Sequence, residues 1–446
     1  MIGRIRVIFF VFLVLFAAAN SGNYCFAAAS SEDVLKVGLQ EVIGMALDSS
    51  EDLKIKDRQV DKTEGAYRET RAGMLPHIDA QYTYLYNIDY PDSMNMGNYN
   101  SITGVTASQV IWSFGKVMHA VDSARKAIDA RRFDREAGKQ EVIYTAKLSY
   151  YTDLLAKKTL SITEGSYANA LENKNLLSKR SYGGRSSKYE ILRMDTEVAA
   201  RVPTVNEARA QFGTATETLK KVIGRESVPG VDLTDDFEEE YGELDYDILV
   251  AALYEYEPSL KSLDKNTESA EANVKSKNAS FLPTVSGFTS WTNLGSPNDS
   301  ALDGNEAGNY AFAGLRVTMP IWEGGEKQAQ LRQARMEKEI AVLQRKRIEK
   351  NLLLELKKAA LEYRQYRDNL KANIEAVRLA EESFKQTQEM FASGQADLTD
   401  LNDSELLFTN QRLNKEMTLF NINVTLAKIE RLIAGHYEGK NGNAKI

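Results

Sequence analysis

The sequence predicts a mainly helical chain that repeats one plan twice and contributes four β-strands to a membrane barrel shared with other copies. Three observations lead to this fold class. Long tracts rich in helix-forming residues lack proline, and two pairs of short segments have the residue pattern of β-hairpins. The landmarks of the first half recur in the second after roughly two hundred residues, as expected of an internal duplication.

The first residues are typical of a secretory leader. Arg4 and Arg6 precede an apolar run over residues 7–19, and three alanines end at Ala29. We expect cleavage after Ala29, so residues 1–29 form a signal peptide. A membrane anchor is the alternative, but about thirteen apolar residues are too few to span a bilayer.

Composition excludes several classes of chemistry in the 446-residue chain. Cys25, the single cysteine, is lost with the leader, which leaves no thiol for a disulfide, a nucleophile or a metal site. The three histidines are far apart in sequence. Net charge is −7, and −9 without Arg4 and Arg6, which argues against nucleic acid as a partner. We therefore expect no cofactor, no metal and no enzymatic activity.

The tract from Glu326 to Ser393 predicts one very long helix. It contains neither glycine nor proline, and its 68 residues would extend roughly 100 Å at 1.5 Å per residue. Apolar residues follow steps of three and four, the spacing of a coiled-coil seam. The predicted seam residues are Leu352, Leu356, Ala359, Tyr363, Tyr366 and Leu370.

Four segments have strand character. "HIDAQYTYLYN" and "AFAGLRVTM" alternate apolar and polar residues with period two, whereas "SITGVTASQVIW" and "PTVSGFTSWTN" are β-branched and aromatic. They predict two hairpins, with strands at about 77–90, 98–112, 283–295 and 309–322.

The two halves of the chain match. "AGMLPHIDA" corresponds to "ASFLPTVSG", and the Ile-Trp pairs ending at Trp112 and Trp322 are 210 positions apart. The first repeat covers 30–224 with a long helix at about 113–182, and the second covers 244–435 with a long helix at about 324–393. An acidic, turn-rich linker occupies 225–243, and 436–446 is a C-terminal tail.

The strands must close with other copies if they enter a membrane. No later segment approaches eighteen consecutive apolar residues, so insertion would have to use strands. A sheet of four strands leaves unpaired edges, and bacterial outer-membrane barrels need about eight strands or more. The alternative is a soluble four-stranded sheet packed on helices.

The motifs "LPxV/I" before each hairpin, "MPIWEGGE" after the second, and "FASGQADLTDLNDSELLFTNQ" resemble the TolC-like outer-membrane efflux protein family over the whole mature chain. This resemblance implies a homotrimer with a shared twelve-stranded barrel in outer-membrane lipid and a long α-helical tunnel in the periplasm. The chain would be a passive exit duct of a tripartite efflux or type I secretion system. Its partners would be a periplasmic membrane-fusion adaptor and an inner-membrane pump of the resistance-nodulation-division or ATP-binding-cassette type.

The resemblance also implies roles at the periplasmic tip. Asp400 and Asp403, three residues apart on one helix face, would ring the closed pore, and Glu190 matches Asp400 in the first repeat. From spacing alone, a solvated helix N-terminus fits these acids equally well. Adaptor docking falls on Gly183, Gly184 and Gly394, whose simpler role is to end helices. Phe391 and Ala396 replace a tyrosine and an arginine that latch the gate in family members, and the residues that could substitute are Tyr182 and Arg185.

The remaining candidates mark the junction between sheet and helices. Trp112 and Trp322 fit an aromatic girdle at the membrane surface, with core tryptophans as the alternative. Pro76 and Pro283 enter the hairpins, Pro320 ends the last strand, and Gly324 and Gly325 turn the chain into the helix. The first junction has one glycine fewer and no proline, so we expect the two to bend differently.

Two further expectations complete the interpretation. Pro203 lies inside a predicted helix and should kink it. The competing function is a periplasmic coiled-coil scaffold without a channel, which would explain the heptads and the leader but not the two matched hairpins.

Overall fold

The computed structural model describes residues 34–86, 99–182, 187–295 and 308–437, and the predicted signal peptide lies outside them. The first half contains β1 (Leu35–Val37), α1 (Leu39–Ser49), α2 (Glu51–Ala72), β2 (His77–Tyr86), β3 (Tyr99–Trp112), α3 (Lys116–Tyr182) and α4 (Lys188–Val222). The second half contains β4 (Val231–Leu233), α5 (Tyr246–Tyr256), α6 (Pro258–Ala279), β5 (Thr284–Gly295), β6 (Asn309–Thr318), α7 (Glu326–Ser393) and α8 (Leu398–Leu432). The predicted fold class, a duplicated order of helix, hairpin, long helix and helix, is confirmed.

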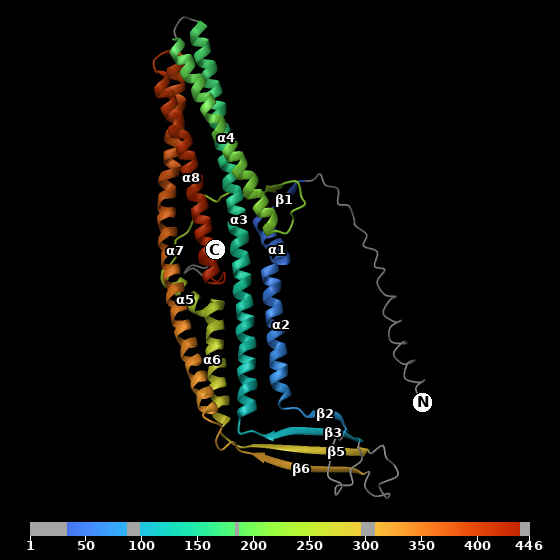
Figure 1. The fold of residues 1–446 in the computed structure, drawn as a ribbon. Helices are drawn as coiled ribbons and strands as arrows, with labels where there is room; N and C mark the ends of the chain where they lie inside the picture. Colours follow the sequence, from blue (N-terminus) through green and yellow to red (C-terminus); the bar gives the residue numbers. More distant parts are fainter. Residues whose placement is uncertain (1–33, 87–98, 183–186, 296–307, 438–446) are drawn as a thin grey trace, which may run out of the picture.

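The molecule is elongated. Its helices run lengthwise, with the sheet of β2, β3, β5 and β6 across one end and the paired ends of α3 with α4 and of α7 with α8 at the other (Figure 1). In the part of the chain that the structure describes, no helix is both long and apolar enough to cross a membrane.

The predicted seam of α7 lies in the main core. Leu356 and Ala359 are fully buried, and Leu352, Tyr363 and Leu370 are buried beside them, with Tyr366 packed against the same cluster. The core also contains residues of α1, α3, α5 and α8. Burial of this apolar stripe, rather than helix propensity, stabilises such long helices in water.

The four-stranded sheet is antiparallel throughout, in the order β2-β3-β5-β6. Hairpins β2–β3 and β5–β6 lie side by side through the β3–β5 pairing, which has a bulge between Val110 and Trp112. Strands β2 and β6 are the two edges. The last strand ends at Thr318, earlier than predicted, because Pro320 has no N–H to donate to a ladder.

The two junctions between strand and long helix each contain two successive residues with positive φ. Gly324 and Gly325 have φ of +60° and +86° immediately before α7, and Phe114 and Gly115 have φ of +49° and +89° immediately before α3. The expected difference in bend is therefore not found in these angles. Instead, Phe114 takes a left-handed conformation that is unfavourable for a residue with a side chain.

The acidic segment predicted as a linker, 225–243, is an ordered part of the core. Its strand β4 pairs in parallel with β1, and Phe237 is buried. Four ion pairs attach it to α3, α7 and α8: Lys157–Asp232 at 2.7 Å, Lys158–Asp236 at 2.5 Å, Lys415–Glu239 at 2.5 Å and Arg367–Glu243 at 3.2 Å. We call residues 231–243 the strap. It crosses helices of both repeats, which a flexible linker would not.

The left-handed pair before α3 gives the first prediction. Replacing Phe114 with glycine should raise the free energy of unfolding by up to about 1 kcal/mol, because relief of the strained φ exceeds the loss of the exposed edge contact with Trp112. Replacing Gly115 with alanine should lower it by about 1–2 kcal/mol, since a Cβ there would lie 3.1 Å from the His119 ring. Thermal unfolding followed by circular dichroism tests both, and a destabilised Phe114→Gly variant would contradict the assignment of strain.

Candidate functional site

The tip of the helical bundle is formed by the ends of four helices. Gly394 ends α7 with φ of +87°, and its N–H donates to the Phe391 carbonyl at 3.1 Å while the Gln395 N–H donates to the Met390 carbonyl at 2.8 Å. Gly394 is therefore a helix-ending glycine, the simpler of its two expected roles. Gly183, Gly184 and Arg185 lie outside the described residues.

Two of the acids predicted for the pore, Glu190 and Asp400, lie in the first turns of α4 and α8, and each takes part in the same kind of cap. The Asp397 carboxylate accepts from the Asp400 N–H at 2.9 Å, and the Asp400 carboxylate accepts from the Asp397 N–H at 3.2 Å. In α4, Ser187 and Glu190 form the same reciprocal pair, with the Ser187 N–H donating to the Glu190 carboxylate at 2.6 Å. Both are capping boxes, which satisfy N–H groups that the first helical turn leaves free.

Capping fixes the position of these carboxylates. Asp400 and Asp403 are both exposed on the first turns of α8. Backbone N–H groups of Asp400 and Thr399 hold the pKa of Asp397 below its usual value, so this end of the helix keeps negative charge at neutral pH. The geometry makes capping one role of Asp400, which is exposed, and of Glu190, which is partly exposed.

Phe391, expected beside the gate, is a core residue of the tip. It is fully buried, and Ala396 packs against the same cluster of residues from all four helices. The cluster, which we call the tip core, consists of Ala170, Leu177, Met194, Phe384, Phe391, Leu398 and Leu401. The substitution of a phenylalanine and an alanine at the expected latch positions thus adds apolar packing between the turns. Tyr182 is the last residue of α3.

A buried ion pair joins the two repeats near the tip, and it was not predicted. Glu405 of α8 has no exposed surface, and its carboxylate lies 2.5 Å from the Arg201 guanidinium of α4. Arg201 also donates to Ser166 of α3 at 2.5 Å, and Thr409 donates to Glu405 at 3.0 Å. The sequence signal was present: Glu405 continues the spacing of Leu398 and Leu401 on the apolar face of α8.

A second buried acid lies in the wall formed by α3 and α4. Asp153 has no exposed surface, and one of its oxygens accepts from the Thr216 hydroxyl at 2.6 Å. Burial raises the pKa of Asp153 to about 6, against the opposing effects of this hydrogen bond and of Lys157.

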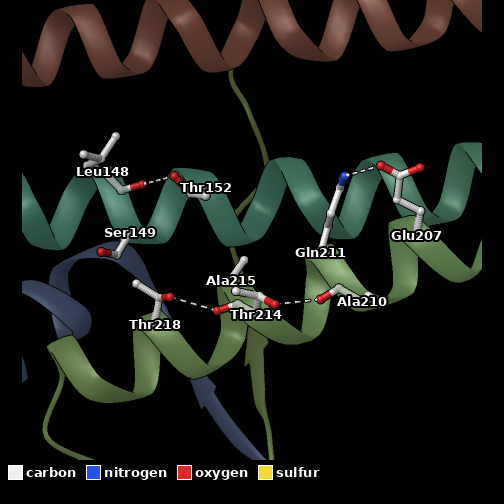
Figure 2. A pocket seen from close by; sticks show the side chains of 9 residues that line it. All are labelled: Leu148, Ser149, Thr152, Glu207, Ala210, Gln211, Thr214, Ala215 and Thr218. Carbon is white, nitrogen blue, oxygen red and sulfur yellow. Dashed lines mark hydrogen bonds between the residues drawn. The ribbon is translucent and has the colours of Figure 1, made fainter.

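Most polar side chains that line the groove of about 580 Å³ between α3 and α4 are already hydrogen-bonded within their own helix. Its threonine hydroxyls donate to carbonyls of their own helices, as Figure 2 shows for Thr152, Thr214 and Thr218. Gln211 donates to Glu207 at 3.3 Å. The groove therefore presents methyl groups and small side chains rather than a catalytic arrangement.

The residues expected at the junction lie at the sheet end of the bundle. Trp112 is 59% exposed and Trp322 is 83% exposed, so neither is a core tryptophan within one chain. Pro76 and Pro283 immediately precede β2 and β5. Pro203 lies within α4.

Comparison with known proteins gives a family match over most of the chain. The profile of the family described as "Outer membrane efflux protein" matches residues 42–225 and 249–435, one segment in each repeat. The solvent efflux pump outer membrane protein SrpC of Pseudomonas putida is 22% identical over 406 residues, covering 87% of this chain and 84% of SrpC. The cation efflux system protein CusC of Escherichia coli O157:H7 is 19% identical over 369 residues, covering 82% and 79%.

Solved structures share the fold. The outer-membrane channel OprN superposes with a TM-score of 0.78 at 16% identity, covering 89% of this chain and 90% of OprN. The MtrE outer membrane channel of Neisseria gonorrhoeae has a TM-score of 0.75 at 18% identity, covering 89% of each chain.

The buried pair between α4 and α8 gives a stability prediction. Glu405→Gln should lower the free energy of unfolding by about 3 kcal/mol or more, because it leaves the Arg201 charge, on a side chain that is only 17% exposed, without a counter-ion. Arg201→Met combined with Glu405→Leu should recover most of this loss, since no charge is then buried. Glu164→Gln, which breaks the exposed pair with Arg209, is the matched control and should cost less than about 1 kcal/mol. Equal effects of Glu405→Gln and Glu164→Gln in thermal unfolding would contradict the assignment.

The raised pKa of Asp153 gives a pH prediction. Between pH 3.8 and about 6 the folded chain keeps a proton that the unfolded chain has lost, so stability should fall as pH rises through this window and stay low above it. Asp153→Asn should abolish the fall and gain at most about 3 kcal/mol at pH 7. Thr216→Val, which removes the hydrogen bond favouring the carboxylate, should extend the fall to higher pH. Melting curves across pH test this, and an unchanged fall in Asp153→Asn would disprove it.

Proposed function

Because the chain belongs to the outer membrane efflux protein family, we propose that it works as one of three copies around a single shared channel. The chain is an outer-membrane efflux protein with its helical bundle in the periplasm. Its family consists of channels rather than enzymes. The number of copies, the partners and the roles of the tip residues are the parts we propose.

The observation that carries the proposal is the contrast between the two faces of the sheet. Paired residues of neighbouring strands share a face, and residues two apart along a strand share it too. The register therefore gathers apolar residues of all four strands on one side: Ile78, Ala80, Tyr82, Val105, Ala107, Trp291, Ala311, Ala313, Leu315 and Val317, with Ser101, Thr103, Gln109, Thr289, Asn293 and Asn309 as polar exceptions. The other side carries the polar residues Asp79, Gln81, Thr83, Thr106, Ser108, Ser290 and Thr292, with Leu85, Ile102, Val110, Phe288, Leu294, Tyr310 and Phe312 as exceptions. One face suits lipid and the other suits a water-filled lumen.

The unpaired edges favour several copies. Strands β2 and β6 each pair on one side only, and unpaired N–H and C=O groups are costly in lipid. Four strands are too few for a closed barrel, whereas three copies supply twelve, within the range of bacterial barrels. The apolar and polar faces would then become the outside and the inside of one wall.

At the tip, three copies would place Asp400, Asp403 and Glu190 around the channel axis. Support comes from the exposure of Asp400 and Asp403 and the partial exposure of Glu190, from their position at the end remote from the sheet, and from the capping boxes that fix two of the three. Such a ring of carboxylates would attract cations and repel itself, which favours divalent binding in the narrow state.

The partners follow from the relatives. SrpC is named as part of a solvent efflux pump and CusC as part of a cation efflux system. By analogy, an inner-membrane pump would deliver cargo through a periplasmic adaptor that docks at the tip turns near Gly183, Gly184 and Gly394. The exposed Trp112 and Trp322 would lie at the inner surface of the membrane.

Conductance tests the carboxylate ring. Asp400→Asn combined with Asp403→Asn removes the charges, and the amide oxygen introduced at position 400 can still accept from the Asp397 N–H and cap α8, so the fold should persist. In planar bilayers this variant should conduct more and require at least about tenfold more divalent cation for block. Glu337→Gln combined with Glu339→Gln, exposed acids near the sheet end of α7, is the control and should behave as the unchanged chain. Unaltered block in the tip variant would rule out the ring.

A further inference from the structure

The charges of the sheet lie on its two edges. Among the described strand residues, the sheet contains one carboxylate, Asp79 on β2, and one guanidinium, Arg316 on β6. Both residues are exposed in the single chain. The central strands β3 and β5 contain no charged residue in their described ranges. An acid on one edge strand and a base on the other are complementary when copies meet edge to edge.

The two charges also share a face. The register places Asp79 in one row with Thr106, Ser290 and Phe312, and Arg316 lies four residues beyond Phe312 along β6. Because side chains alternate with period two, Arg316 is on the same polar face as Asp79. Within one chain two strands separate β2 from β6, and the Arg316 guanidinium lies over the Phe288 ring, 4.7 Å from its centroid.

Closure of a barrel sets how far the edges are displaced. Strands about 4.8 Å apart and tilted by about 35–45° shift along each other by about 13–19 Å over the four spacings of one copy, which is about four to six residues. His77, Ser108, Phe288 and Gly314 lie opposite one another in one row across the sheet. When this row is extended into β2 of the next copy, Gly314 is therefore opposite the residue four or six positions after His77 of that copy. The shift must be an even number of residues, because an odd shift would put the polar face of one copy on the same side as the apolar face of the next. A shift in the other direction would place Gly314 beside the end of α2, where no strand exists.

In both permitted registers, Arg316 lies near Asp79 of the next copy. With a shift of four residues, Arg316 is directly opposite Asp79 of the next copy. With a shift of six it is opposite Gln81 and diagonal to Asp79, at about 7–8 Å between Cα atoms, which a long side chain can reach. We infer that Arg316 of each copy pairs with Asp79 of the next across the β6–β2 seam, on the lumen side, and that this pair fixes the register in which copies close. The inference rests on the proposed assembly of three copies.

Charge reversal tests the seam. Asp79→Arg and Arg316→Asp would each place like charges at all three seams, and the combined variant would restore opposite charges. For full-length chain purified in detergent at low salt, each single variant should weaken the trimer by about fivefold per seam, or roughly a hundredfold in all, and the combined variant should recover most of this. Added salt should shrink the difference. Single variants without effect, or a combined variant no better than either, would overturn the seam pair.

Cysteine pairs locate the register directly. In a Cys25→Ser background, oxidation should link chains when Arg316→Cys is combined with either Asp79→Cys or Gln81→Cys, because directly opposed strand residues have the Cα separation of a disulfide. Ser286→Cys with Asp79→Cys is the matched control, since Ser286 lies in the same row as Arg316 but on a central strand, and it should not link chains. Trimers without crosslinks at either position would refute the seam and leave the proposed channel intact. Absence of trimers in the unmodified chain would refute the three-copy proposal itself.

Discussion

Unpaired backbone groups along β2 and β6 are the constraint on which the rest of this molecule depends. A free edge in lipid costs several kcal/mol for each unsatisfied group, so four strands of this sheet cannot enter a membrane without neighbours. In both repeats most apolar residues of the strands lie on one face and most polar residues on the other, which is the pattern such an assembly requires. The left-handed pairs at Phe114–Gly115 and Gly324–Gly325 then turn the chain from the sheet into helices that leave it in a common direction.

The helical bundle is specified by polar groups as well as by its seam. Apolar stripes alone would tolerate sliding of one helix along another, because leucine and alanine repeat with similar spacing. Glu405 and Asp153 are buried between helices, and in the observed alignment their partners are Arg201 and Thr216 respectively. Their burial costs stability and in return discriminates between alignments of the packed helices.

Periodicity made most of the fold predictable from sequence. The α7 seam, both hairpins and the helix-ending Gly394 depend on residue spacing within a short segment. The structure has each of them at the residues that this spacing predicts. The β1–β4 pairing involves three residues on each side from distant parts of the chain, too short for a pattern to show. The Arg201–Glu405 contact depends on how two helices are aligned, which no local pattern reports. The capping boxes at Ser187 and Asp397 were readable, since each cap residue precedes an acid by three positions.

The strap holds helices of both repeats together away from their ends. Its ion pairs connect it to α3, α7 and α8, which are helices of both repeats, at residues inside each helix rather than at its ends. Helices held away from their ends behave as levers about the point where they are held: a small rotation there becomes a large displacement at the remote turns.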